Sequence, residues 1–301
     1  MSKPQTIAVV GLGSMGYGIA QSILRAGHTV HGIDVVPAQV DRFRAEGGAA
    51  GALADIAGAI DTLVVVVLNA AQTEAVLFGA HGAVARMKPG AAVIACATVP
   101  PDFARAMAAR CAGHGVHYLD APISGGAAKA AGGALTVMAS GTAEAFDASR
   151  PALDAMAQKV FTLGDSAGAG SAMKAVNQLL AGVHIAAMAE ALTFGMTQGV
   201  APETFVEVIS QCAGTSWMLE NRAPHVVSGD YTPKSSVNIW PKDLGIVLDI
   251  ARSSQFSAPI SAAAMQQFLA AAGMGLGGED DAAVAKVYAR NAGLTLPGEK
   301  A

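Results

Sequence analysis

The sequence of 301 residues has few charged residues, few aromatic residues and only three cysteines. Charged side chains make up 14% of it and aromatic side chains 5%, whereas hydrophobic residues make up 52%. So large an apolar fraction excludes a disordered chain, which would have too little apolar surface to bury. The cysteines, Cys96, Cys111 and Cys212, are odd in number and widely spaced. This spacing argues against a disulfide framework or a cysteine metal site and predicts scattered core thiols.

The chain also lacks a basic run and a long apolar run. With 19 Lys+Arg against 23 Asp+Glu, its net charge is −4, so a nucleic-acid partner is not expected. The apolar stretch TLVVVVL is too short to cross a bilayer, which takes about 20 residues, and the N-terminus shows no signal-peptide core. We therefore expect no membrane segment and a cytoplasmic location.

The order of the predicted elements indicates two domains. Up to residue 164, short strands alternate with helical patterns; the strands are expected at 7–10, 29–34, 62–69, 92–98, 115–122, 134–140 and 159–164. Continuous apolar strands are typical of a parallel sheet covered on both faces. This predicts an α/β domain with a doubly wound, Rossmann-type sheet over residues 1–164. After the glycine-rich break DSAGAG only helical patterns follow, which predicts an all-α domain over 165–301.

A glycine motif, GLGSMG, lies between the first predicted strand and a helical segment. It consists of Gly11, Leu12, Gly13, Ser14, Met15 and Gly16. In a dinucleotide site Gly11 permits a tight turn, Gly13 lets the backbone approach a pyrophosphate, and Gly16 lets helix and strand pack closely. The N-terminus of the helix adds N–H groups and partial positive charge for the phosphates. A turn rich in glycine for packing alone is the alternative.

Asp34 ends the second predicted strand, about 20 residues after the glycine motif. Its carboxylate can accept hydrogen bonds from the ribose hydroxyls of adenosine, and it would repel a 2′-phosphate. The residues that follow, Val35, Val36 and Pro37, could not hold that phosphate. The sequence therefore predicts NAD rather than NADP as the cofactor. The alternative is an aspartate that ends the strand and caps a turn.

Three further residues follow predicted strands. Ligands of doubly wound sheets bind outside the carboxyl ends of the strands. Leu68, Asn69 and Thr98 fall at such ends, so they are candidate cofactor contacts, although each could simply be a strand terminus.

The segment 170–195 is predicted to be one long buried helix, yet it contains Lys174, with Asn177 and Gln178 close behind. A buried cation is costly unless something requires it. Lys174 and Gln178 share one helical face at the start of the helix, which we expect to face a cleft between the domains. An amine there suits removal of an alcohol proton while hydride passes to NAD. A surface lysine whose charged end reaches solvent is the alternative.

Four motifs together resemble the β-hydroxyacid dehydrogenase family, of the 3-hydroxyisobutyrate dehydrogenase type. They are GLGSMG (11–16), DAPISGG (120–126), GAGSAMKAVNQ (168–178) and KDLG (242–245). Within that family, NQLLAGVHIAAMAEAL, CAGTSWMLENR and GDYTPKSSVNIWPKDLG resemble the subgroup that oxidises the C2 hydroxyl of L-threonate with NAD. Activity on 3-hydroxyisobutyrate, or reduction of tartronate semialdehyde, would use the same residues. A nucleotide-binding scaffold without turnover is the non-enzyme alternative.

The resemblance implies that Lys174 is the general acid/base of the reaction. Family members that reduce imines usually lack this lysine. The residue four positions after the lysine is commonly Asn in the family, where it orients the substrate hydroxyl. Here that residue is Gln178, as in the threonate subgroup, and Asn177 precedes it. Which of the two contacts the substrate is left open.

The resemblance also implies how a small hydroxy acid would be held. Ser124, Gly125 and Gly126 would grip its carboxylate, mainly through N–H groups and a hydroxyl. Thr98 would lie beside the nicotinamide, and Lys242 would close over cofactor and substrate. No residue cluster calls for a metal. The alanine- and glycine-rich helices leave apolar surface that predicts a homo-oligomer, a dimer or a tetramer.

Overall fold

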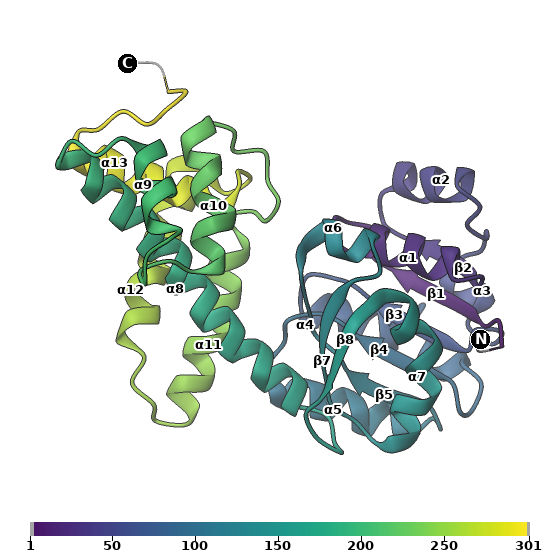
Figure 1. The fold of residues 1–301 in the computed structure, drawn as a ribbon. Coiled ribbons are helices and arrows are strands. Elements are labelled where there is room, and N and C mark those ends of the chain that lie inside the picture. Colours follow the sequence, from purple (N-terminus) through teal and green to yellow (C-terminus); the bar gives the residue numbers. More distant parts are fainter. Residues whose placement is uncertain (1–2, 300–301) are drawn as a thin grey trace. The chain divides into compact units, whose positions relative to one another are not determined.

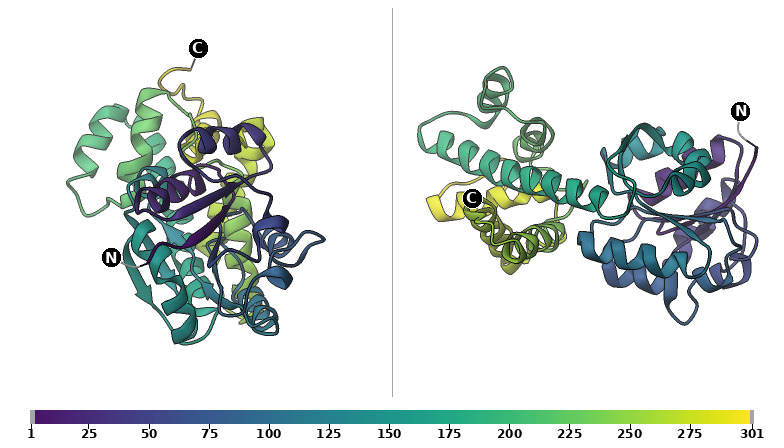
Figure 2. Two further views of the ribbon diagram at one scale, coloured as in Figure 1. Left: turned by 90° about the vertical axis from the view of Figure 1, so that its right-hand side faces the viewer. Right: turned by 90° about the horizontal axis from the view of Figure 1, so that it is seen from below.

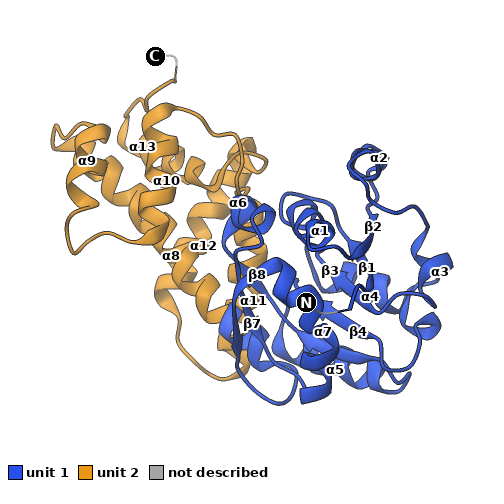
Figure 3. Ribbon diagram, turned by 45° about the vertical axis from the view of Figure 1, so that its right-hand side comes forward, with its two compact units in different colours: residues 1–174 blue, residues 175–301 orange. Residues whose placement is uncertain are grey.

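The computed structural model describes residues 3–299 and divides into two compact units, which meet between Lys174 and Ala175 (Figure 3). The first is an α/β unit and the second is helical, as the sequence predicts. The division falls inside α8 (Ala169–Thr197), the long helix that runs from teal into green in Figures 1 and 2. The domain boundary expected at residue 164 stays a prediction, since the first turns of α8 are counted with the α/β unit.

Unit 1 alternates strands and helices. Its strands are β1 (Thr6–Val10), β2 (Thr29–Ile33), β3 (Thr62–Val65), β4 (Ala92–Ala95), β5 (His117–Asp120), β6 (Ile123–Ser124), β7 (Leu135–Ala139) and β8 (Ala157–Thr162). Its helices are α1 (Gly16–Arg25), α2 (Pro37–Ala45), α3 (Leu53–Ile56), α4 (Ala70–Phe78), the 3-10 turn η1 (Val84–Arg86), α5 (Pro101–Ala112), α6 (Gly126–Ala131) and α7 (Ala143–Met156), followed by the start of α8.

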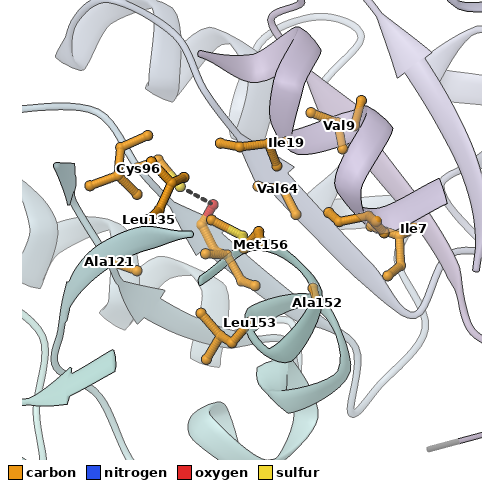
Figure 4. Close-up of a cluster of buried hydrophobic side chains, with 14 of the residues drawn as sticks. Ile7, Val9, Ile19, Val64, Cys96, Ala121, Leu135, Ala152, Leu153 and Met156 are labelled. Carbon is orange, nitrogen blue, oxygen red and sulfur yellow. Dashed lines mark hydrogen bonds between the residues drawn. The ribbon is translucent and has the colours of Figure 1, made fainter. Parts of the chain in front are cut away.

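The main sheet of unit 1 is parallel, with the strand order β2-β1-β3-β4-β5. Successive side chains of a strand point to opposite faces, and the central strands β1, β3 and β4 are buried on both. Ile7 and Val9 join the core formed with α1 and α7 (Figure 4). Ala8 and Val10 join the core on the other face, with α4 and α5. This two-sided covering confirms the doubly wound arrangement.

Two strands do not extend this sheet as expected. β7 and β8 form a separate three-stranded sheet with β6, in the order β6-β7-β8. β6 pairs antiparallel with β7, and β7 pairs parallel with β8. The sequence did not indicate β6, which is only two residues long. The two sheets are joined by an isolated bridge between Asp120, the last residue of β5, and Ser140, which follows β7.

Unit 2 consists of the rest of α8 and the helices that follow it. These are α9 (Pro202–Ile209), α10 (Trp217–Ser228), α11 (Ile239–Ser253), α12 (Pro259–Ala271), η2 (Ala272–Leu276), η3 (Asp281–Val284) and α13 (Ala285–Ala292). α10 was not expected from the sequence, and it contains a proline, Pro224. Gly182 of α8 allows α11 to pack closely, because a Cβ there would lie 2.9 Å from the Trp240 ring.

α8 confirms the long helix expected at 170–195, but the helix is only partly buried, because Val176, Leu180 and Phe194 are exposed. Among residues 3–299 it is the one helix long and apolar enough to cross a membrane by length and composition. Its buried side chains, including Ile185, Met188 and Leu192, belong to the core of unit 2, so its apolar character has a role in the helical core.

The three thiols differ in burial. Cys96 and Cys111 are buried, and burial raises the pKa of each thiol to about 12. Cys212 is exposed, so the expectation of a core thiol is wrong at that position. It lies just beyond the end of α9, where the chain turns at the surface.

Candidate active site

The glycine motif forms the turn from β1 into α1, and two of its glycines are required by close contacts. Gly11 has φ +95°, and a Cβ there would lie 2.2 Å from the Val66 carbonyl oxygen. At Gly16 a Cβ would lie 1.8 Å from the Gly11 oxygen. Gly13 differs, since a Cβ there would meet no atom within 4 Å. Gly11 and Gly16 therefore permit the turn, while Gly13 leaves open space where a ligand can approach the backbone.

This turn lies where the strand order reverses. β2 lies on one side of β1, whereas β3, β4 and β5 follow on the other. Crevices at such switch points bind the ligands of doubly wound sheets. The N-cap residue of α1, Met15, gives no side-chain hydrogen bond to the helix, which suits a helix N-terminus that receives phosphate. The residues present thus fit a dinucleotide.

Asp34 is linked to the glycine turn by hydrogen bonds. Its Oδ2 accepts from the Leu12 N–H at 2.6 Å, and its Oδ1 accepts from the Val36 N–H at 2.8 Å. The turn-capping alternative is therefore present in the structure. It does not exclude the cofactor role, because a carboxylate has about four acceptor sites. The hydrogen bonds hold the carboxylate beside the turn, and contact with ribose stays a prediction.

The other candidate cofactor contacts lie after β3 and β4. The Leu68 side chain is 62% exposed. Asn69 caps α4, since its Oδ1 accepts from the Gln72 N–H at 2.9 Å. Thr98 is half-buried and follows the end of β4. Asn69 therefore has a structural role as the N-cap of α4. None of the three residues shows a feature that by itself identifies a nucleotide contact.

The structure brings Lys174 to the DAPISGG segment. Lys174 is 9% exposed, and its Nζ donates a hydrogen bond to the Ile123 carbonyl oxygen at 3.0 Å. The surface-lysine alternative is therefore wrong for this residue. Ile123 begins β6, and Ser124, Gly125 and Gly126 follow directly. Two motifs that are 51 residues apart in the sequence thus meet within unit 1.

The loop after β6 has an unusual backbone. Gly125 has φ +136° and Gly126 has φ +78°, values that residues with a Cβ rarely adopt. A Cβ at Gly125 would also lie 2.9 Å from Cδ of Lys129. At Gly126 a Cβ would meet nothing within 4 Å, so the backbone there is open to an approaching group.

Four polar residues form a connected network in unit 2. Asn177 Nδ2 donates to Gln178 Oε1 at 2.9 Å, and Gln178 Nε2 donates to Oδ2 of the buried Asp243. Lys242 Nζ lies 2.6 Å from Asp243 Oδ1. Both ends of the Gln178 amide are therefore engaged within unit 2. Sequence reasoning missed Asp243; the available signal was its position in KDLG, directly after Lys242.

The described residues, 3–299, contain no group of three or more His, Cys, Asp or Glu side chains that could hold a metal ion. The polar side chains of the site are instead amines, amides, hydroxyls and carboxylates. This set suits binding of a carboxylate substrate and transfer of a proton.

Family models match both parts of the chain. Residues 6–164 match the NAD binding domain of 6-phosphogluconate dehydrogenase, and residues 168–288 match a model described as NAD-binding of NADP-dependent 3-hydroxyisobutyrate dehydrogenase. An L-threonate dehydrogenase of Cupriavidus necator is 54% identical, over 98% of this chain and 99% of the relative. One of Pectobacterium atrosepticum is 46% identical, over 98% and 96%. A crystal structure from Salmonella typhimurium, described as 3-hydroxyisobutyrate dehydrogenase, superposes with a TM-score of 0.89 at 47% identity, covering 94% of this chain and 99% of the other.

The fold and the glycine turn define an NAD-dependent oxidoreductase with a Rossmann-type domain and a helical domain. The chain belongs to the 3-hydroxyisobutyrate dehydrogenase-related family of β-hydroxyacid dehydrogenases. It is accordingly an NAD-dependent dehydrogenase.

Substitution of Gly13 separates a ligand effect from a folding effect. Gly13→Ala adds a methyl group in open space, so we expect unfolding stability to stay the same or rise by about 0.4–1 kcal/mol. We expect the dissociation constant for NAD, measured by calorimetry, to rise about tenfold or more, because the methyl group would meet the pyrophosphate.

Two other glycines provide the controls for this substitution. Gly58→Ala, at an exposed turn with only an ordinary contact at 3.4 Å, should change neither property. Gly16→Ala should lower the stability by about 1–3 kcal/mol, because it overpacks the turn. Wild-type NAD affinity in Gly13→Ala would contradict the assignment of this turn to the pyrophosphate.

Proposed function

We propose that the enzyme oxidises the C2 hydroxyl of L-threonate to a ketone, giving 2-oxo-tetronate, and that Lys174 is its general acid/base. The observation that carries this proposal is the buried Lys174 amine, hydrogen-bonded to Ile123 at the start of the Ser124–Gly126 loop. The identity of 54% to an L-threonate dehydrogenase over nearly the full chain supports the choice of substrate.

Lys174 handles the proton in this proposal. A neutral amine accepts the proton of the C2 hydroxyl as the C2–H bond breaks and the C2–O bond becomes a carbonyl. NAD, when bound, supplies the acceptor for the hydride. The Ile123 carbonyl accepts one hydrogen of the amine at 3.0 Å, which orients the nitrogen lone pair away from it. A base positioned in this way contributes about 10²–10⁴-fold to the rate.

The substrate carboxylate is proposed to bind the Ser124–Gly126 loop through N–H groups and the Ser124 hydroxyl. In a 2-hydroxy acid the reacting hydroxyl stands on the carbon next to the carboxylate, so base and carboxylate site must lie close together. The contact of Lys174 with the residue before Ser124 supports such a short separation. In 3-hydroxyisobutyrate the reacting hydroxyl is one carbon further away.

The remaining predicted contacts complete the proposal. Cofactor contacts are assigned to Gly11, Leu12, Gly13, Ser14, Met15, Gly16, Asp34, Leu68, Asn69, Thr98 and Lys242. Of the two amides, Asn177 is the better candidate for the substrate, because both ends of the Gln178 amide are engaged with Asn177 and Asp243.

The proposal also places the enzyme in the cytoplasm. Recovery of its activity with sedimented membranes would contradict that location.

A panel of hydroxy acids tests the substrate assignment. We expect L-threonate to give the highest kcat/KM with NAD. The rate is measured spectrophotometrically from the reduction of the nicotinamide. D-Glycerate, which is one carbon shorter, should be lower by roughly 10–200-fold. 3-Hydroxyisobutyrate should also be lower, because its reacting hydroxyl lies one carbon further from the carboxylate. The same panel with NADP should give little rate, since Asp34 would repel the 2′-phosphate. A highest rate on 3-hydroxyisobutyrate would favour the function given to the Salmonella structure, and no rate on any acid would favour a binding scaffold.

Substitution of Lys174 tests the assignment of the base. Lys174→Met keeps a side chain of similar length and removes the amine, so we expect kcat to fall about 10²–10⁴-fold while the dissociation constant for NAD stays within about twofold of wild type. Lys159→Met, on the exposed edge strand β8, is the matched control and should leave kcat unchanged. Near-normal turnover by Lys174→Met would assign the proton to another group.

A homo-oligomer is the proposed assembly. In unit 2, α8 exposes Val176, Leu180 and Phe194, at intervals that fall on one side of a helix. A groove beside Phe194 is lined by residues of α8 and α13, among them Ala191 and Tyr288. Exposed apolar side chains along one side of a helix are typical of interfaces, and we propose that a second copy of the chain covers them.

The oligomer proposal predicts the molar mass in solution. Light scattering should give at least twice the 30.1 kDa of one chain. Phe194→Glu should lower that mass, because a charge would be buried without a partner. Glu203→Gln, on α9, is the surface control. A monomeric wild type would contradict the proposal.

A further inference from the structure

The first turn of α8, which precedes Lys174, is fixed by two buried side chains from outside the helix. Asp120 Oδ2 accepts hydrogen bonds from the Gly168 and Ser171 N–H groups, each at 2.9 Å. Ser140 Oγ accepts from the Gly170 N–H at 2.9 Å. The N–H groups at a helix start have no partner within the helix. Here a carboxylate and a hydroxyl supply partners for three of them.

Side-chain hydroxyls complete this cluster. Ser171 Oγ donates to Asp120 Oδ1 at 2.7 Å, and Ser140 Oγ donates to Asp120 Oδ2 at 3.3 Å. Asp120, Ser140 and Ser171 are each at most 1% exposed. All of these partners donate to the Asp120 carboxylate, so an amide in its place would present hydrogens to donors. The charge-assisted bonds of such a carboxylate are about twice as strong as neutral ones.

Asp120 and Ser140 are themselves held where the two sheets of unit 1 join. The Asp120 N–H donates to the Ser140 backbone carbonyl oxygen at 3.0 Å, and the Ser140 N–H donates to the Asp120 backbone carbonyl oxygen at 2.8 Å. α8 also approaches this junction closely, because a Cβ at Gly170 would lie 2.4 Å from the Met138 oxygen. The start of α8 is therefore attached to a rigid part of the fold.

The chain closes a ring through these contacts. Asp120 is three residues before Ile123, whose carbonyl accepts from Lys174 Nζ. Ser171 is three residues before Lys174, and it donates to Asp120. The segment that leads into the Ser124–Gly126 loop is thus tied to α8 at both ends. Movement of the first turn would change the place of the amine relative to the loop.

The groups around Asp120 compete in their effect on its charge. Burial has the larger effect and raises the pKa of this carboxyl above its usual range, while the hydrogen bonds from Ser171, Gly168 and Ser140 oppose that rise. Cys96 and Tyr118 also lie close enough for its charge to contribute to the raised pKa of each. Both the hydrogen bonds to Asp120 and the positive N-terminal end of α8 favour the ionised form.

We propose that Asp120 is a positioning residue for the reaction: it anchors the first turn of α8 and so sets the Lys174 amine against Ile123 and the loop. Its role rests on the proposed function of Lys174. Asp120 does not touch substrate or cofactor in this proposal. A displacement of about 1 Å at a reacting group can reduce a rate about 10²-fold.

Asp120→Asn tests the proposal by two readouts. We expect kcat to fall about 10- to 100-fold while the dissociation constant for NAD stays within about twofold, because the glycine turn follows a different strand. Hydrogen exchange of a peptide covering residues 166–174 should become faster. Acylation of Lys174, followed by mass spectrometry, should also become faster, since the amine would lose its protected place.

Two sets of variants accompany this test. Ser171→Ala and Ser140→Ala each remove side-chain hydroxyl contacts and keep the carboxylate, so they should give smaller losses in kcat. These two variants test the proposal if Asp120→Asn does not fold. Asp61→Asn is the matched control, because Asp61 accepts from the Thr6 N–H at 2.8 Å and pairs with Lys88. It should affect stability and leave kcat unchanged.

The outcomes distinguish the two proposals. If Lys174→Met is inactive while Asp120→Asn and the serine variants keep wild-type kcat and wild-type exchange, the positioning role is wrong and the base assignment stands. If Lys174→Met is active, the base assignment is wrong. In that case faster exchange in Asp120→Asn without loss of kcat would reduce Asp120 to a purely structural anchor.

Discussion

The hydrogen bond from the buried Lys174 amine to the Ile123 carbonyl is the interaction on which the candidate site depends. A buried amine without a partner would be costly, so the carbonyl of β6 makes its burial possible. The same contact joins the helix that enters unit 2 to the loop of Ser124, Gly125 and Gly126. The proposed catalytic amine and the loop proposed to bind the substrate carboxylate are thereby held together.

The glycine turn could be predicted from the sequence because its signal is local: three glycines at fixed spacing between a strand and a helix. Gly11 and Gly16 show the close contacts that their positions imply, and Gly13 shows the open space that its position implies. The alternation of apolar strands and helices likewise predicted the main sheet, and the apolar composition of residues 170–195 predicted α8. In these segments local pattern and tertiary structure agree.

Long-range contacts explain what the sequence could not predict. β7 and β8 have ordinary strand patterns, and only pairing with the two-residue β6 assigns them to a second sheet. Asp120 ends a strand in the same way as Asp34, yet its carboxylate accepts from residues 48 and 51 positions away. The exposure of Cys212 similarly depends on where a turn lies rather than on its apolar neighbours.

Two polar residues of α8, Ser171 and Gln178, share one kind of partner, a buried carboxylate. Within unit 1, Ser171 is held by the carboxylate of Asp120. Within unit 2, Gln178 is held by the carboxylate of Asp243. Each acid is almost fully buried and belongs to the same unit as its partner. The two units thus each fix part of this helix by a buried acid, and Lys174 lies between the two anchored residues. A helix anchored in this way can carry an amine and amides at defined positions, because hydrogen bonds to the two acids add to the apolar packing of α8.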